Sequence, residues 1–314
     1  MARTFRSSRR DILKLASGTL LPRGLSAAVT REPPVIFPKE PRSRLAVTSY
    51  PFRTFLVSPT NSERNPALPA MDMLEFPAFI AGEFGVFNIN PLINHFKSTD
   101  AAYLNAFLQA LRKANSHIVD LGLPGGRFYS EDAAVRETAV ATAKKSVDIA
   151  SQLGSPSVRL HVSGKKDLKP DVDVASASLA DVAAHGEKKN VVVNLENDNP
   201  VAEDPFFLVA VIEKVGNPYL RALPDFGNSF IGHDSAFNHR AVKAMLGHAF
   251  NMCHVKDTVE GDDGHMKQVD LADMFSLAKS CGYRGYFSME FETRAGDPVT
   301  GTKRLVDETL KFLN

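Results

Sequence analysis

The sequence predicts an α/β fold in which eight parallel strands close into a (β/α)8 TIM barrel. Short apolar runs alternate with amphipathic helical patterns from Leu45 to the end of the chain. Most of the runs are apolar at consecutive positions, which is typical of parallel strands that helices cover on both faces. No Gly-x-Gly-x-x-Gly follows the first run, so an open dinucleotide-binding sheet is less consistent with the sequence.

The predicted strands are short and lie at intervals that leave room for a helix between neighbours. They are residues 45–50, 85–90, 117–121, 157–162, 191–196, 220–225, 251–255 and 285–290. The predicted helices are residues 71–81, 101–114, 132–153, 174–189, 204–215, 235–247, 269–281 and 302–313. In such a barrel, the active site is expected at the carboxyl ends of the strands.

The amino-terminal residues 1–30 are expected to be separate from the barrel at 45–314, with a Pro-rich connector at 31–44. Residues 8–14, SRRDILK, resemble the twin-arginine export signal, with Ile12 where that pattern has Phe. The weakly apolar stretch that follows is too short for a permanent membrane span. We therefore expect a twin-arginine-like signal and a periplasmic or exported protein; the alternative is a disordered tail on a cytoplasmic protein.

Composition limits the classes of partner. The formal net charge is +1, which provides no electrostatic footprint for a nucleic acid or an acidic membrane surface. Cys253 and Cys281 are too few for a disulfide framework. A small sugar or polyol is the expected partner, and no dense basic cluster argues for a phosphate on it. Self-association stays open.

Four residues that can bind a cation stand at or beside the ends of four successive predicted strands. Glu196, Asp225, His254 and Glu290 end the runs VVVNLE, YLRALPD, NMCH and YFSME. These strand ends line one arc of a closed barrel, so the side chains can converge on one point. Three carboxylates and one imidazole favour a single divalent ion, Mn²⁺ or Mg²⁺ ahead of Co²⁺ or Zn²⁺.

The segments around these residues resemble a known family. They are Leu195-Glu196-Asn197, residues 224–228 (PDFGN), residues 254–257 (HVKD) and residues 288–292 (SMEFE). Together they resemble the sugar phosphate isomerase/epimerase superfamily, whose fold is a xylose isomerase-like barrel. The resemblance implies a divalent metal bound by Glu196, Asp225, His254 and Glu290. The chain departs from many members at Asn228, where they have a histidine.

The resemblance and the chemistry together predict a sugar isomerase or epimerase. A bound metal would stabilise the enediolate that forms when a 2-hydroxyketone loses a carbon-bound proton. We assign this proton transfer to Glu196 and Glu290. The residues expected to bind substrate hydroxyls or to orient the ligands are Lys256, Asn197, Asn228 and His161.

Three other functions remain open at this point. A dehydratase or lyase would share the enediolate step and then eliminate a hydroxyl. A non-catalytic sugar-binding barrel would be expected to lose one of the glutamates, but both are present. An endonuclease-IV-like phosphodiesterase needs more histidines at the strand ends than this chain has.

Overall fold

The structure, a computed structural model, describes residues 32–162, 169–199 and 201–314. The predicted export signal at residues 8–14 lies outside the described residues, and it stays a prediction. None of the described helices is long and apolar enough to cross a membrane. The predicted connector contains one short 3-10 helix, η1 at Arg42–Arg44, ahead of the first strand.

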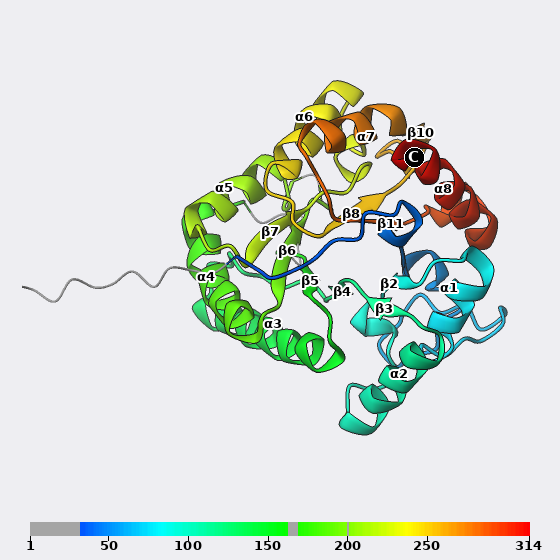
Figure 1. Cartoon of the computed structure of the whole chain (residues 1–314). Helices are drawn as coiled ribbons and strands as arrows, with labels where there is room; N and C mark the ends of the chain where they lie inside the picture. The colour runs from blue at the N-terminus through cyan, green and yellow to red at the C-terminus, as the bar shows by residue number, and fades with distance from the viewer. Residues whose placement is uncertain (1–31, 163–168, 200) are drawn as a thin grey trace, which may run out of the picture. The chain divides into compact units, whose positions relative to one another are not determined.

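The described strands form the wall of a parallel barrel, which confirms the predicted (β/α)8 fold (Figure 1). One sheet has the order β3-β2-β1-β11-β8, and a second has the order β4-β5-β6-β7. The strands of the wall are β1 Leu45–Thr48, β2 Asn88–Asn90, β3 His117–Ile118, β4 Leu121–Gly122, β5 Ser157–Leu160, β6 Val192–Glu196, β7 Leu220–Leu223, β8 Met252–Val255 and β11 Tyr286–Met289.

The two sheets join at two seams. At the first seam, β3 and β4 are two halves of one predicted strand, separated only by Val119 and Asp120. At the second, isolated parallel bridges pair Ala222 with Ala249 and Asp225 with His254. The second seam therefore places two of the predicted metal ligands side by side at the carboxyl end of the barrel.

Eight α-helices of the described residues follow the strands and lie outside them (Figure 1). Aspartates cap the amino termini of all of them except α1, accepting hydrogen bonds from backbone N–H groups of the first turn. These caps explain why most helices begin within a few residues of the predicted positions. The helices are α1 Phe76–Phe84, α2 Ala101–Lys113, α3 Ala133–Leu153, α4 Val172–Lys189, α5 Pro205–Val215, α6 Ser235–Leu246, α7 Leu271–Ser280 and α8 Pro298–Leu313.

Two local features differ from the predicted elements. The first helix begins at Phe76 instead of residue 71, with Pro77 in its first turn, where proline is well tolerated. A short antiparallel hairpin, β9 Thr258–Glu260 and β10 Met266–Gln268, follows β8 and was not predicted. Its strands carry few apolar residues, so they lack the hydrophobic pattern that indicates a strand.

Candidate metal centre

The structure brings the four strand-end residues together, and we call Glu196, Asp225, His254 and Glu290 the strand-end cluster. One ligand atom of each lies within 4.8 Å of the ligand atoms of the others. His254 Nδ1 lies 2.6 Å from Glu196 Oε1, 3.1 Å from Glu290 Oε2 and 3.9 Å from Asp225 Oδ2. All four side chains are buried. The predicted convergence is therefore present in the fold.

Backbone pairing holds each member of the strand-end cluster in place. Glu196 is the last residue of β6, and His254 lies within β8. The bridge between Asp225 and His254 joins the chain after β7 to β8. The amide of Glu290 donates to Val255 O at 2.9 Å, which continues the pairing of β11 with β8. The cluster thus rests on strand hydrogen bonds, which position side chains more rigidly than loops do.

Asp225 shows that the cluster fits a cation. Its Oδ1 accepts hydrogen bonds from the amides of Gly227 at 2.8 Å and Asn228 at 2.7 Å, which fixes the carboxylate. Its Oδ2 is buried and accepts no hydrogen bond from the described residues, although Lys256 Nζ lies 3.4 Å away. A buried carboxylate oxygen without a partner is costly, so a metal ion among these three carboxylates and one imidazole would satisfy it. Oxygen ligands with one nitrogen suit a divalent ion.

Proton affinities in the cluster agree with this interpretation. Burial raises the pKa of Asp225 to about 6, against the opposing effect of the Lys256 ammonium. Burial alone would lower the pKa of His254, but the carboxylates of Glu290 and Glu196 raise it to about 9. Without a cation, His254 therefore carries a proton at neutral pH that a metal ion would displace.

Arg159 belongs to the site and was not predicted. It lies on β5, is buried, and its Nη1 is 2.9 Å from Glu196 Oε2. Gly122 makes room for it, because a Cβ at that position would lie 2.8 Å from Arg159 Nη2. The sequence does contain a signal, since Arg159 is a charged residue within the predicted strand at residues 157–162. A buried cation in contact with Glu196 offsets part of the negative charge of the cluster.

Two of the predicted substrate-binding residues, Lys256 and His161, line a cavity beside the strand-end cluster. Lys256 Nζ lies 3.1 Å from Glu290 Oε1 and 3.4 Å from Asp225 Oδ2, and it donates to Asn228 Oδ1 at 2.7 Å. Burial alone would lower the pKa of Lys256, but Asp225 and Glu290 raise it well above the ordinary value, so the ammonium stays charged. His161 Nδ1 lies 3.2 Å from Glu203 Oε2. Both Lys256 and His161 line the cavity described below.

The other two predicted residues contact the protein itself. Asn197 accepts from the amide of Asp225 at 2.9 Å and donates to Ser229 Oγ at 2.8 Å. Asn228 is buried and accepts from Lys256. Neither asparagine lines the cavity beside the cluster, so their contact with substrate stays a prediction. What the structure shows is that they hold Asp225 and Lys256 in position.

A cavity of about 840 Å³ opens beside the strand-end cluster, and we call it the central cavity. One end carries the charged groups of the strand ends and the other runs toward α3, and the ammonium groups of Lys97 and Lys145 also line the cavity. Its size and mixed lining are those of a small-molecule site. The lining residues at the charged end are Tyr50, Arg159, His161, Glu196, Asp198, Lys256 and Glu290.

Solved structures share this fold. A xylose isomerase-like TIM barrel protein from Mycobacterium smegmatis in complex with magnesium is 17% identical, with a TM-score of 0.63, covering 86% of this chain and 96% of that one. L-ribulose 3-epimerase is 17% identical, with a TM-score of 0.66 and coverages of 86% and 95%. D-allulose 3-epimerase from Methylomonas sp. in complex with D-allulose is 17% identical, with a TM-score of 0.63 and coverages of 89% and 98%.

Sequence comparison gives the family directly. No curated protein sequence matches this chain significantly. The profile of the family described as xylose isomerase-like TIM barrel matches residues 82–314, which is most of the chain and includes the whole strand-end cluster. Because this profile matches most of the chain and the barrel fold agrees with it, the chain belongs to the xylose isomerase-like TIM barrel family.

Proposed function

We propose that this protein is a divalent-metal-dependent sugar isomerase or epimerase that moves a proton next to a carbonyl group. The observation that carries the proposal is the strand-end cluster at the wall of the central cavity, in which the buried Asp225 Oδ2 has no hydrogen-bond partner among the described residues. Structural neighbours named as epimerases of L-ribulose and D-allulose support the choice of a sugar substrate. The magnesium complex of another neighbour supports the choice of a divalent ion.

The strand-end cluster would hold the ion. When bound there, a divalent ion supplies Lewis-acid stabilisation of the negative charge that develops on the oxygens of a 2-hydroxyketone. Mn²⁺ and Mg²⁺ are the favoured ions because three of the four ligands are carboxylates.

Glu196 and Glu290 are the proposed proton carriers. Both line the central cavity, and they come from β6 and from the end of β11, with β7 and β8 between them in the wall. Burial would raise the pKa of each, but His254 and Arg159 lower that of Glu196, and His254 and Lys256 lower that of Glu290. Both carboxylates are therefore ionised at neutral pH and can accept a proton. One removes the carbon-bound proton, and the other, after protonation, returns one to the carbon.

Lys256 and His161 are the proposed contacts to substrate oxygens. The Lys256 ammonium is charged and lines the central cavity beside Glu290, where it can donate to an oxygen that gains negative charge. His161 lines the same cavity near Glu196, with its Nε2 3.6 Å from Glu196 Oε2. These donors and the ion would fix which carbon of the sugar faces the two glutamates.

The position of Lys256 also favours a second candidate, a metal-dependent sugar dehydratase or lyase. An ammonium next to a proton-accepting glutamate can donate a proton to a departing hydroxyl after the carbon-bound proton is removed. Both reactions begin with the same proton removal. They differ in whether a C–O bond of the substrate breaks.

Solvent exchange tests the shared step. The purified protein with Mn²⁺ or Mg²⁺ is incubated in deuterated water with D-allulose, D-tagatose and L-ribulose, and proton NMR follows loss of the carbon-bound proton. We expect exchange in at least one sugar, and we expect Glu290→Gln to slow it by about 10² to 10⁴-fold. Glu83→Gln, which changes an exposed glutamate on α1, is the matched control and should not slow it. Undiminished exchange in Glu290→Gln would rule out its role.

A further inference from the structure

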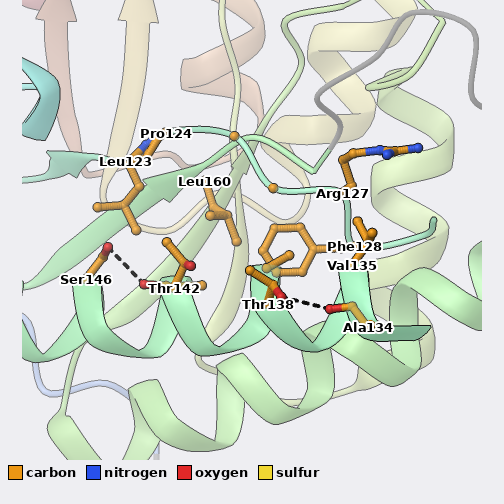
Figure 2. Close-up of a pocket in the computed structure, with 14 residues that line it drawn as sticks. Leu123, Pro124, Arg127, Phe128, Ala134, Val135, Thr138, Thr142, Ser146 and Leu160 are labelled. Atoms are coloured by element: carbon orange, nitrogen blue, oxygen red, sulfur yellow. Dashed lines mark hydrogen bonds between the residues drawn. The ribbon is translucent and has the colours of Figure 1, made fainter. Parts of the chain in front are cut away.

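Two loops that follow barrel strands are held in different ways. The loop after β4 is held by apolar side chains: Figure 2 shows Leu123 and Phe128 gathered over α3, where they border a cavity of about 400 Å³. The loop after β7, residues 225–233, is held by the β9–β10 hairpin, and we call it the Asp225 loop. This second loop carries a proposed metal ligand, so its support matters for the site.

The Asp225 loop arranges two charged groups of the site. The amides of Gly227 and Asn228 both donate to Asp225 Oδ1, at 2.8 and 2.7 Å. The side chain of Asn228 also accepts from Lys256 Nζ at 2.7 Å. Lys256 Nζ in turn lies 3.1 Å from Glu290 Oε1. One short loop therefore fixes the positions of the Asp225 carboxylate and of the Lys256 ammonium.

One face of the β9–β10 hairpin packs on this loop. Lys267 of β10 pairs directly with Val259 of β9, so the two side chains point to the same side of the hairpin. Val259 is buried, and a Cβ on Gly227 would lie only 2.5 Å from its Cγ1. The missing side chain of Gly227 therefore lets the hairpin approach the residues whose amides hold Asp225.

Lys267 supplies the polar part of the same contact. Its Nζ donates to three backbone carbonyls of the loop, those of Phe230 and Ile231 at 3.1 Å each and that of His233 at 3.3 Å. These carbonyls lie at the end of the 3-10 turn η4, Asn228–Phe230, a place where basic side chains commonly bind. The base of the hairpin is also fixed, because the Val269 amide and the Gln268 side chain both donate to Asp257 O, at 2.8 and 2.6 Å.

We propose that the β9–β10 hairpin is a brace for the Asp225 loop, and that Lys267 is a positioning residue that acts through this loop on Asp225 and Lys256. The inference rests on the proposed function only in treating Asp225 as a metal ligand. Lys267 itself lies outside the described lining of the central cavity, so its action is indirect. Without its three bonds, the loop opens more often, and the carboxylate of Asp225 is held less firmly for a metal ion.

Amide hydrogen exchange of the metal-free full chain tests the brace. Mass spectrometry follows peptides from residues 225–233 and, as a reference, from α4. We expect Lys267→Met to speed exchange in residues 225–233 by about tenfold or more relative to α4, because it removes hydrogen bonds from a charged donor. Lys267→Arg should keep exchange slow, since a guanidinium also donates to carbonyls. Lys279→Met, which removes an exposed lysine of α7, is the matched control and should change nothing.

Two further variants separate a brace from general stability. Phe128→Leu loosens the apolar packing of the loop after β4, so it should lower the melting temperature without speeding exchange in residues 225–233 relative to α4. Val259→Ala removes packing against Gly227 and should speed that exchange, which covers the case in which Lys267→Met does not fold. Unchanged exchange in Lys267→Met, or in Val259→Ala if it alone folds, overturns the proposal. An equal increase in Phe128→Leu also overturns it.

Metal binding tests the consequence for the site. Titration calorimetry should show Mn²⁺ binding about tenfold more weakly to Lys267→Met, and unchanged in Lys267→Arg and Lys279→Met. Faster amide exchange without weaker Mn²⁺ binding would overturn the positioning role, because the hairpin then only stabilises the fold.

The brace and the proposed function fail separately. No Mn²⁺ binding by the unmodified protein would reject the ion of the proposed function, and amide exchange alone then decides whether the hairpin braces the loop. Faster amide exchange in Lys267→Met, together with no proton exchange in any sugar, would reject the proposed function and leave the brace. Proton exchange that depends on Glu290, together with unchanged amide exchange in Lys267→Met, would reject the brace alone.

Discussion

Asn90 Oδ1 lies 2.8 Å from His254 Nε2, on the side of the imidazole that faces away from the strand-end cluster. The orientation of the Asn90 amide is fixed, because its Nδ2 donates to Asp120 O at 3.0 Å and to Asp120 Oδ1 at 3.2 Å. The amide oxygen must then accept from His254, so Nε2 carries a proton. His254 Nδ1 is left as the nitrogen that faces Glu196 and Glu290. The second nitrogen of a metal-binding histidine is commonly fixed in this way.

Replacing Asn90 should therefore weaken metal binding. Asn90→Leu removes the acceptor for His254 Nε2, so the ring can turn or take the other tautomer, and we expect a loss of about 10 to 100-fold in affinity for Mn²⁺. Titration calorimetry measures it. Asn88→Leu on the same strand is the control, because Asn88 donates only to Ser43 O and Leu45 O and should not change the affinity. An unchanged affinity in Asn90→Leu would show that the pair does not orient the ligand.

Metal binding should become tighter as the pH rises. In the metal-free protein the pKa of Asp225 is raised to about 6 and that of His254 to about 9, so a cation must displace their protons. We expect affinity for Mg²⁺ to rise between about pH 6 and pH 9, with release of about one proton at pH 7.5. Calorimetry in buffers of different ionisation enthalpy counts that proton. His239→Gln changes a half-exposed surface histidine and should leave the count unchanged.

The same shifts set the sign of the pH dependence of stability. Both folded-state pKa values lie above the ordinary values of 3.8 for Asp225 and 6.5 for His254. Their contribution to the free energy of unfolding is thus present at low pH and is lost as the pH rises through about 6 and about 9. The increase in melting temperature that Mg²⁺ produces should accordingly grow across this range. An increase that stays constant with pH would contradict this linkage.

Arg159→Met should destabilise the metal-free protein strongly. It removes one partner of the buried contact with Glu196, and breaking such a pair costs about 3–5 kcal/mol. A saturating divalent ion should restore part of that loss, because it supplies positive charge next to the same carboxylate. Urea unfolding with Mg²⁺ and with EDTA measures both effects. Arg294→Met, which removes an exposed ion pair with Glu260, is the control and should show neither the destabilisation nor the recovery with Mg²⁺. If Arg159→Met lowers the free energy of unfolding equally with and without Mg²⁺, Arg159 acts by packing alone.

The parts of this protein that follow local rules could be predicted from its sequence. Apolar runs and helical periodicity predicted the order of the strands and helices along the chain. The aspartate caps kept most helix starts close to their predicted positions. Glu196 and Glu290 were found because a charged residue at the end of an apolar run has little reason to be there except to face a cleft. The roles of Asn90 and Arg159 were missed because they depend on contacts with His254 and Glu196, far away in the sequence. An arginine within a predicted strand is a local signal, but it does not identify the partner.

Two helical glycines offer a matched test of the fold itself. Gly186 lies on α4, and a Cβ there would meet Val191 O at 2.4 Å, a backbone atom at the start of the next strand region. Gly186→Ala should therefore push α4 away from the barrel wall and lower the free energy of unfolding by about 1–3 kcal/mol. Gly82 lies on α1, and beyond its own stretch of helix no described atom lies within 4 Å of its added Cβ. Gly82→Ala should therefore raise the free energy of unfolding by about 0.5–1 kcal/mol through helix propensity. Urea unfolding of the two variants separates close packing from backbone entropy, and stabilisation by both would show that α4 can move away without loss of packing.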